Sequence, residues 1–492
     1  MTLTTPAAAD RRVVMFVHND ATNDSRVLRE AATLASAGYA VTLVARTRRT
    51  DPPRILRERL GGVDVIRVPL PTRWRRTMAL LVTPWRQWRE DATSIRAALP
   101  RPDRWPEIAR LVLTRFATLA VSVLLLPAGL LWFAVGRSRY RELVQWTLRW
   151  RFGTLGWNRA AAAAAPQADV YHGHDLSALP AAAQAATLNG GLLVYDSHEV
   201  FLESGSNARR PRWARVMLSR LERRLAGQAA ALVTVNDALA EVLTARLPIR
   251  RVVVVHNCPP HWTPPAAPPG LLRAAAGIGP EVPLVLYHGG FSAHRGLEEL
   301  AAALLEPGMD GVHAAYLGYG SMRSWLDTQA AVPTYGGRLH VVDAVPPDVL
   351  LDWVADADAG VMAIQPSTLN HRLATPNKLF ECMAAGVPSV VSDMPGMRAI
   401  ALDPELGPVG EVCDPADPAS IAAAIRRILD LGHAERAALR ARCLRAAHER
   451  WNWEVESRQL IALYADLAPG AAPAAPVVAA SVAPVDPAVP PA

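Results

Sequence analysis

The sequence predicts an α/β protein of two domains, each built on a parallel β-sheet. Three observations support this prediction. The 492 residues are too many for one ordinary domain. Short apolar strands alternate with helical segments in both halves of the chain. A stretch rich in proline and glycine, residues 259–282, separates the two series, and we expect it to be the interdomain linker.

The N-terminal domain is predicted over residues 11–258. Its first helix is expected at 24–37, where Asp24 or Ser25 can cap the free amide groups of the first turn. The strands on either side of this helix complete a βαβ unit, which requires parallel pairing. Strands of this domain are expected at 13–18, 40–45, 169–172, 192–196, 231–235 and 252–256.

The C-terminal domain is predicted over residues 283–432. Residues 433–467 are predicted to be helical, and residues 468–492, mostly alanine, proline and valine without periodicity, are expected to be a disordered tail. Strands of this domain are expected at 284–288, 313–317, 338–342, 359–363 and 388–391.

A basic, tryptophan-rich segment at 71–157 interrupts the N-terminal domain. It holds 15 arginines against 5 acidic residues and 8 of the 14 tryptophans. Residues 116–136 are 21 uncharged residues flanked by arginines, which is about the length of a membrane-spanning helix. Arginine and tryptophan beside such a run are typical of membrane interfaces. We therefore expect a membrane-associating insert, in preference to a nucleic-acid-binding segment.

The topology of the insert stays open. The strands before and after it are expected in one sheet, so both ends of the insert lie on one side of a bilayer. Pro127 and Gly129 could break the apolar run into a re-entrant hairpin or a monotopic anchor. The alternatives are a second span near 78–84 or an unusually apolar core helix.

The cysteine content and the N-terminus indicate the compartment. The four cysteines are scattered without a CxxC pair, which argues against a zinc site or a disulfide framework. The N-terminal residues have no apolar core that could act as a signal peptide. We expect a cytoplasmic protein that is held peripherally or monotopically at the inner face of the cell membrane.

Two motifs in the C-terminal half carry candidate chemistry. In HGGFSAHRGL at 288–297, Gly289 and Gly290 allow a tight turn, and Arg295 precedes a helix; backbone amides and a guanidinium together suit a diphosphate. In PNKLFECMAAG at 376–386, Lys378 is the only lysine of the chain. Lys378 and Glu381 share one helix face, so the lysine could bind a phosphate and the carboxylate could accept hydrogen bonds from ribose hydroxyls.

With these motifs in place, the chain resembles the GT4-like glycosyltransferases (glycosyltransferase family 4, group 1), a large GT-B family that mostly retains anomeric configuration. The matching stretches cover roughly residues 13–70 and 168–465, in the family's order. They are NDSRVLREAATLASAGYAVTLVA, DVYHGHDLSALPAA, VYDSHEVF, VVHNCPP, YHGGFSAHRGLEEL, YLGYG and PNKLFECMAAGVPSVVSD. The resemblance implies the GT-B fold: two Rossmann-like βαβ domains facing across a cleft, with the C-terminal helices returning toward the N-terminal domain.

The resemblance also implies roles for single residues. Arg295 and Lys378 would neutralise the leaving diphosphate, and His174 would lie beside the reacting sugar as a third catalytic residue. The donor would be bound by Gly289, Gly290, Arg295, Lys378, Leu379 and Glu381, with its base near 341–345. Asp175, His198 and Glu199 would line the acceptor side of the cleft.

The sequence departs from the family pattern at two positions. Leu373 stands eight residues before Glu381, where the family often has a glutamate that contacts the donor sugar. Phe291 stands close to the position of the usual arginine of the phosphate-binding loop. These departures bear on how the sugar is held and on retention of configuration.

The expected activity is hexosyl transfer from a nucleotide sugar to a lipid-linked or membrane-proximal glycan acceptor. No cluster of carboxylates in the sequence suggests a catalytic metal, and neither a metal nor another cofactor is expected. The alternatives are a nucleotide-sugar epimerase of the same fold and a non-catalytic membrane-binding scaffold. A dehydrogenase is disfavoured because 18–23, HNDATN, has no G-x-G-x-x-G pattern after the first strand.

Overall fold

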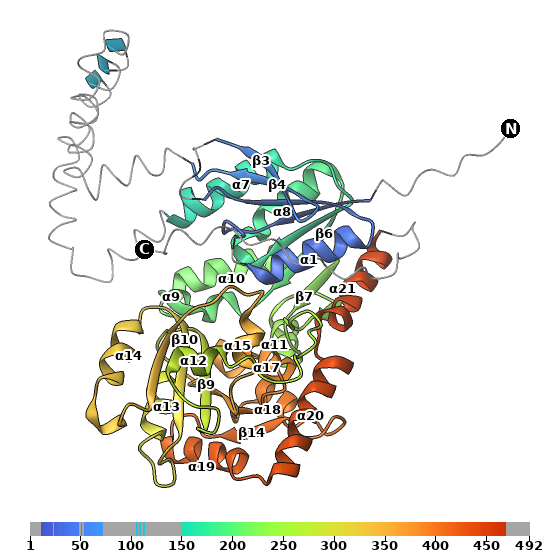
Figure 1. Ribbon diagram of the computed structural model, residues 1–492. Helices are drawn as coiled ribbons and strands as arrows, with labels where there is room; N and C mark the ends of the chain where they lie inside the picture. The colour runs from blue at the N-terminus through green and yellow to red at the C-terminus, as the bar shows by residue number, and fades with distance from the viewer. Residues whose placement is uncertain are drawn as a thin grey trace.

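A computed structural model describes residues 11–22, 24–48, 51, 54–71, 105–106, 108–109, 112–113 and 149–468. Two α/β domains make up this part of the chain (Figure 1). Each domain has one mostly parallel sheet with helices on both faces, as the sequence predicts. The apolar run at 116–136 lies outside the described residues. Within them, no helix is long and apolar enough to cross a membrane.

The sheet of the N-terminal domain has eight strands in the order β3-β4-β2-β1-β5-β6-β7-β8. Its strands are β1 (Arg12–Phe16), β2 (Ala40–Arg46), β3 (Leu56–Leu60), β4 (Val63–Val68), β5 (Val170–His174), β6 (Leu192–Ser197), β7 (Ala231–Thr234) and β8 (Val252–Val254). All neighbours pair in parallel except β3, which forms an antiparallel hairpin with β4 at the edge. The sequence did not predict this hairpin because β3 (LRERL) has three consecutive charged residues and apolar residues only at its two ends.

Helices cover both faces of this sheet because successive strand residues point to opposite sides. Val14 and Phe16 of β1 face the cluster that contains the buried side of α8, whereas Val13 and Met15 face α1. The helices are α1 (Ser25–Ser36), α7 (Leu155–Ala164), α8 (Asp175–Asn189), α9 (Gly205–Ala208), α10 (Arg212–Ala226) and α11 (Asp237–Arg246), with the helical turns η2 (Arg149–Thr154) and η3 (Phe201–Glu203). Asp24 caps α1 by accepting a hydrogen bond from the Val27 amide at 3.3 Å.

The C-terminal end of the tryptophan-rich segment belongs to the core of the N-terminal domain. Trp157 begins the buried face of α7, is fully buried and donates its indole N–H to the Val68 carbonyl at 3.0 Å. This tryptophan, which the sequence analysis groups with the membrane-associating insert at 71–157, therefore stabilises the domain from inside. The tryptophan count alone does not separate the two roles, because a buried core and a membrane interface favour the same ring.

The sheet of the C-terminal domain has six strands in the order β11-β10-β9-β12-β13-β14, all parallel. Its strands are β9 (Leu284–Gly290), β10 (His313–Tyr319), β11 (Leu339–Asp343), β12 (Ala359–Met362), β13 (Ser389–Ser392) and β14 (Gly410–Cys413). Its helices are α12 (Leu271–Ala276), α13 (Leu297–Ala303), α14 (Arg323–Ala330), α15 (Leu350–Val354), α16 (Leu369–Arg372), α17 (Asn377–Ala384), α18 (Pro395–Ala401) and α19 (Pro418–Leu429), with the turn η4 (Pro333–Tyr335). Short α12 lies inside the stretch expected to be only a linker.

Two helices end the described chain, α20 (His433–Glu449) and α21 (Trp453–Leu467). Helix α20 stays with the C-terminal domain, and α21 lies beside α1 of the N-terminal domain (Figure 1). Trp453 donates its indole N–H to Thr33 Oγ1 at 2.8 Å, and the Tyr464 hydroxyl shares a hydrogen bond of 2.7 Å with His172 Nδ1. The break between the helices is marked by Asn452, which caps α21.

The strand orders locate the functional site. In each sheet the order reverses direction at one point, between β1 and β5 in the first domain and between β9 and β12 in the second. Ligands of open α/β sheets bind at the carboxyl ends of the strands at such a switch point. Three non-glycine residues of the described chain have positive φ angles, and they follow the carboxyl ends of β1, β5 and β9: Ala21, Asp175 and His294. Strained backbone of this kind clusters at functional sites.

Candidate active site

A cleft of about 1040 Å³ separates the two domains at these strand ends. The N-terminal wall comes from the loops after β1, β6 and β7, and the C-terminal wall from residues 292–295 and the segment around α16. His198, Glu199 and Arg295, all predicted from the sequence, line this cleft. Pro376 and Asn377, at the beginning of α17, also line the cleft.

Lys378 follows Asn377 on α17 and lies between the Tyr287 ring and Gly289. Its Nζ lies 3.6 Å from the centre of the Tyr287 ring, which provides a cation–π contact. A Cβ atom placed on Gly289 would come within 3.6 Å of the same amine, and the φ angle of Gly289, +107°, favours glycine in any case. Burial and, after it, the charge of Arg295 lower the pKa of Lys378 to about 7, and the charge of Glu381 opposes part of the shift. A bound anion would raise this pKa and so favour the protonated, charged form of the amine.

Glu381 lies one helical turn beyond Lys378 and is held by a histidine that the sequence analysis did not single out. His288 Nε2 lies 2.8 Å from Glu381 Oε2. Burial raises the pKa of Glu381, but the His288 hydrogen bond and charge outweigh it, so the net shift is downward. Glu381 is thus kept as a carboxylate. The only sequence signal for His288 is its position at the end of a buried strand, directly before the glycine pair.

The phosphate-loop residues differ in what they can offer. The side chain of Arg295 borders the cleft, whereas Phe291 is fully buried against Tyr287, with ring centroids 6.2 Å apart. Phe291 therefore adds no charge where the family has a cation. Gly296 follows at φ +83°, and a Cβ there would clash with the Ala363 carbonyl oxygen at 2.4 Å. Only glycine permits this close approach of the loop to β12.

The remaining predicted donor residues are placed differently. Gly290 is exposed at the end of β9, so its backbone is accessible from the cleft side of the sheet. Leu379 is buried in the core of the C-terminal domain, with 1% of its surface exposed. Its side chain packs against the fold, and only its backbone could contact a donor.

On the opposite wall, His198 is the predicted residue with the strongest electrostatic environment. Its Nε2 lies 3.0 Å from Asp196 Oδ2, its Nδ1 lies 3.5 Å from Asp175 Oδ2, and its backbone N–H donates to Asp175 Oδ1 at 3.1 Å. Burial lowers the pKa of His198, but the two carboxylates outweigh it and raise the pKa to about 10. Beside it, burial and the charge of Asp175 raise the pKa of Glu199 to about 7.

His174 lies behind His198, away from the cleft surface. It is 1% exposed, and its Nδ1 is 3.1 Å from Asp196 Oδ2 and 3.4 Å from His198 Nε2. Burial and the neighbouring His172 lower its pKa to about 3, so its ring is neutral. The sequence places His174 beside the reacting sugar, but in this conformation His198 faces the cleft and His174 supports it from behind.

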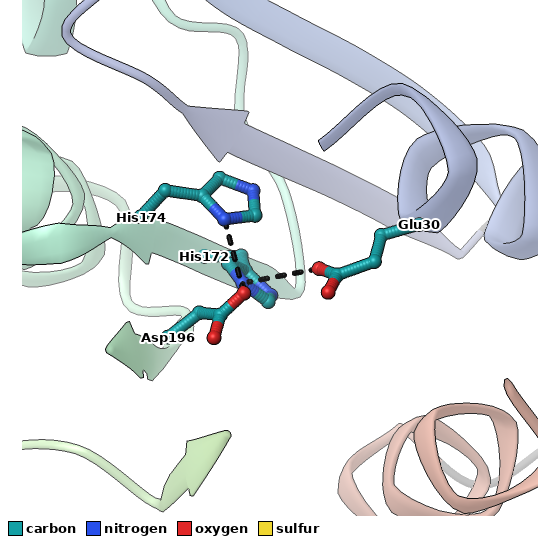
Figure 2. Close-up of side chains that lie close together, drawn as sticks. All are labelled: Glu30, His172, His174 and Asp196. Atoms are coloured by element: carbon teal, nitrogen blue, oxygen red, sulfur yellow. Dashed lines mark hydrogen bonds and ion pairs between the residues drawn. The ribbon is translucent and has the colours of Figure 1, made fainter. Parts of the chain in front are cut away.

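His174 belongs to a buried cluster that the sequence did not predict (Figure 2). Glu30, from α1, meets His172, His174 and Asp196 from β5 and β6, and ligand-type atoms of the four lie within 4.8 Å of one another. Groups of this kind can hold a metal ion. Here the guanidinium of Arg26 lies among the carboxylates, with Nε 2.9 Å from Glu30 Oε1 and Nη2 3.4 Å from Asp196 Oδ1. The cluster already contains a fixed cation, and the absence of a catalytic metal stays a prediction.

Direct contacts hold the two cleft walls together. The Asn370 side chain accepts a hydrogen bond from the Val200 amide at 2.8 Å and donates to Glu199 Oε2 at 3.2 Å. Asn236 donates to the Leu373 carbonyl at 2.8 Å and to Thr375 Oγ1 at 3.0 Å. The Leu373 side chain packs against the apolar cluster of the N-terminal domain. Where the family often has a sugar-contacting glutamate, this chain has an interdomain contact.

The raised pKa of His198 predicts how stability depends on pH. A histidine whose folded pKa of about 10 exceeds the ordinary 6.5 stabilises the fold fully below pH 6.5 and loses that contribution as the pH rises toward 10. The difference in unfolding free energy between the wild type and His198→Gln should therefore shrink between pH 6.5 and pH 10. Urea titrations at several pH values measure it, with His433→Gln, at an exposed position on α20, as control. A constant difference across this range would contradict the assignment.

Comparisons with known proteins agree with this geometry. The profile described as glycosyltransferase family 4 matches residues 120–258, and the profile described as glycosyl transferases group 1 matches residues 282–431. No curated protein sequence matches the chain.

Solved structures show the same fold at low sequence identity. Sucrose-phosphate synthase from Thermosynechococcus elongatus is 17% identical, with a TM-score of 0.63 over 93% of this chain and 99% of that one. A trehalose-6-phosphate protein from E. coli bound with UDP-2-fluoro glucose is 14% identical, with a TM-score of 0.60 over 93% and 98%. Anabaena HepE in complex with UDP is 13% identical, with a TM-score of 0.57 over 93% and 100%.

The fold, the interdomain cleft and these matches define an enzyme class: the protein is a glycosyltransferase of the GT-B type. Within that class, the chain belongs to the glycosyltransferase group 1 and family 4 proteins, whose domains it carries in its two halves.

Proposed function

We propose that the protein transfers a sugar, with retention of configuration, from a nucleotide-sugar donor to a lipid-linked or membrane-proximal acceptor. The observation that carries the donor half is the proximity of two basic side chains at the switch point of the second sheet: Arg295 lines the cleft, and Lys378 lies beside Tyr287 and Gly289, close enough for the two charges to interact. A departing diphosphate develops negative charge, and fixed cations in a partly enclosed site stabilise it. Glu381, kept ionised by His288, would accept the ribose hydroxyls.

The N-terminal wall suits an acceptor that approaches from the other side. His198 is held as a cation by Asp175 and Asp196, and Glu199, whose pKa is about 7, lies next to it. Glu199 is the group of this wall that can exchange a proton with an acceptor hydroxyl near neutral pH. His174 would keep His198 oriented through their shared contact with Asp196. No step of this scheme uses a metal or an organic cofactor.

The ligands of similar structures support the donor class. Anabaena HepE is described in complexes with UDP and with UDP and glucose, and the E. coli protein with UDP-2-fluoro glucose. We expect a nucleotide sugar here as well, and we propose the inner face of the cell membrane as the place of reaction. The lipid-linked acceptor is supported by the arginine and tryptophan content of residues 71–157.

Transfer of radiolabelled sugar into organic-extractable lipid tests the proposal. Membranes of the source cells would be incubated with the full chain and, in turn, UDP-, GDP- and ADP-linked sugars. One donor class should label the lipid fraction, and Lys378→Ala should abolish the labelling. The proton NMR coupling of the anomeric position in the product reports retention. Labelling of water-soluble sugars alone would overturn the lipid acceptor, and an inverted anomer would overturn retention.

A further inference from the structure

Helix α10 carries an apolar, basic surface that the glycosyl-transfer scheme does not use. Trp213, Val216 and Met217 point outward with 48%, 47% and 61% of their surface exposed. They follow the i, i+3, i+4 spacing of one helix face, and Arg212, Arg220 and Arg224 are exposed around them. We call these six residues the α10 face.

The α10 face is presented rigidly. The opposite side of the helix is buried through Ala214, Leu218 and Ala226. Glu222, the only acidic residue of the helix, also points inward, where its Oε1 accepts a hydrogen bond from the Tyr195 hydroxyl at 2.8 Å. The outward side of α10 therefore displays cations and apolar groups without a carboxylate of its own.

The ion pairs of the described residues do not neutralise this surface. Arg215 of the same helix forms an ion pair with Glu203 at 2.7 Å, so its charge is neutralised within the domain. Among the described residues no carboxylate lies within ion-pair distance of Arg212, Arg220 or Arg224. An exposed tryptophan with aliphatic neighbours and unpaired arginines fits the interface of an anionic bilayer, where the rings and chains enter the headgroup region and the guanidinium groups meet lipid phosphates.

The position of the α10 face connects this surface to the cleft. Arg209, just before α10, lines the cleft together with Ser204, Gly205 and Ala208 at and around α9. The turn η3, which precedes α9 in the chain, contacts the end of the tryptophan-rich segment, where the centroids of the Trp150 and Phe201 rings lie 5.8 Å apart. The segment expected to associate with membranes therefore rejoins the N-terminal domain at η3, next to α9, whose residues line the cleft.

We infer that the α10 face docks on an anionic lipid surface and turns the Arg209 edge of the cleft toward the bilayer. The α10 face would then set the orientation of the enzyme, whatever attachment the insert provides. The inference goes beyond the proposed chemistry, because a surface can dock on lipid whether or not the acceptor is lipid-linked.

A site-specific probe tests the inference in the full chain. All four native cysteines are buried, so Met217→Cys gives one accessible thiol for an environment-sensitive fluorophore. Its emission should shift to the blue on vesicles of equal parts phosphatidylglycerol and phosphatidylcholine, and not on phosphatidylcholine alone. A probe at Leu305→Cys, 46% exposed in the C-terminal domain, should not shift. No shift at position 217, or an equal shift at both positions, overturns the inference. A blue-shifted probe before vesicles are added would show that another part of the chain covers the face, which also overturns it.

A charge test separates the α10 face from general attraction between a basic protein and an acidic membrane. Arg220→Glu with Arg224→Glu is compared with Arg445→Glu with Arg458→Glu, an equal change in net charge at exposed positions on α20 and α21. Each surface arginine contributes roughly fivefold in affinity. The first double variant should therefore weaken the affinity for vesicles, measured from the lipid concentration that gives half of the shift at position 217, by at least about 25-fold. The second should weaken it far less; equal losses overturn the inference. Thermal stabilisation by nucleotide sugars is read in parallel and should stay unchanged, so that failure of donor binding is recognised separately.

Discussion

Replacing Lys378 with alanine is expected to lower kcat/KM for glycosyl transfer by on the order of 10²- to 10³-fold, as is typical when one fixed stabilising group is removed from a developing anion. The amine lies between the Tyr287 ring and Gly289. Steady-state assays measure the effect, with whichever of the UDP-, GDP- and ADP-linked sugars serves as donor. Arg372→Ala, which removes an exposed cation of neighbouring α16, is the matched control and should change the rate less than twofold.

The same residue should reveal itself in the proton balance of donor binding. The pKa of Lys378 is about 7 without a bound anion, and the charge of a bound diphosphate raises it, so binding at pH 8 must take up a fraction of a proton. Donor affinity should therefore decrease as the pH rises above 7. Calorimetry in buffers of different ionisation enthalpy measures the uptake, which should disappear in Lys378→Ala. A binding enthalpy independent of the buffer at pH 8 would argue against a neutral Lys378 before donor binding.

Replacing Arg26 with methionine is expected to destabilise the protein by about 3–5 kcal/mol, the usual cost of removing one member of a buried charge pair. Arg26 is 4% exposed, faces Asp196 and Glu30, and donates to the Val255 carbonyl at 2.7 Å. Without it, Asp196 would be left with histidines alone. For a domain of this size the loss corresponds to a fall in the thermal midpoint of roughly 10 °C.

A surface pair of the same residue types provides the control. Arg251 and Asp466 form an ion pair of 2.7 Å with 40% and 65% of their side chains exposed. Arg251→Met should cost less than about 1 kcal/mol because solvent screens the pair. Scanning calorimetry resolves the two domains if they unfold separately. Equal effects of the two substitutions would mean that the buried cluster is not held together by Arg26.

Local patterns in the sequence were sufficient for most of the fold. Strand β1, helix α1 with its Asp24 cap, and strand β2 lie within about two residues of their expected positions, because apolar runs and caps are signals read over a few neighbours. The β3–β4 hairpin and β14 were missed. Strand β14 has four residues, GEVC, with too few apolar positions to stand out before pairing with β13 supplies its neighbours.

The site was predictable only where single motifs hold it. Lys378 with Glu381, and Arg295 beside the glycine pair, come from continuous stretches of sequence. The structure places them near the carboxyl end of β9. The partners His288 and Arg26 were not predicted, because their contacts with Glu381 and Asp196 join residues 93 and 170 positions apart. The inward placement of His174 also depends on such distant packing, since Asp196 comes from a different strand.

The position of α21 has a consequence for how the protein is made. Tyr464 and Trp453 complete the N-terminal domain by contacting His172 and Thr33, although about 200 residues separate them from the end of that domain. At about 5–20 residues per second, a ribosome needs roughly 10–40 s to add that length. During this time the face of α1 that α21 covers in the finished protein is open to water and to other chains. The domain that is synthesised first is thus finished last, and an N-terminal half expressed without α21 is expected to need that helix supplied as a separate peptide.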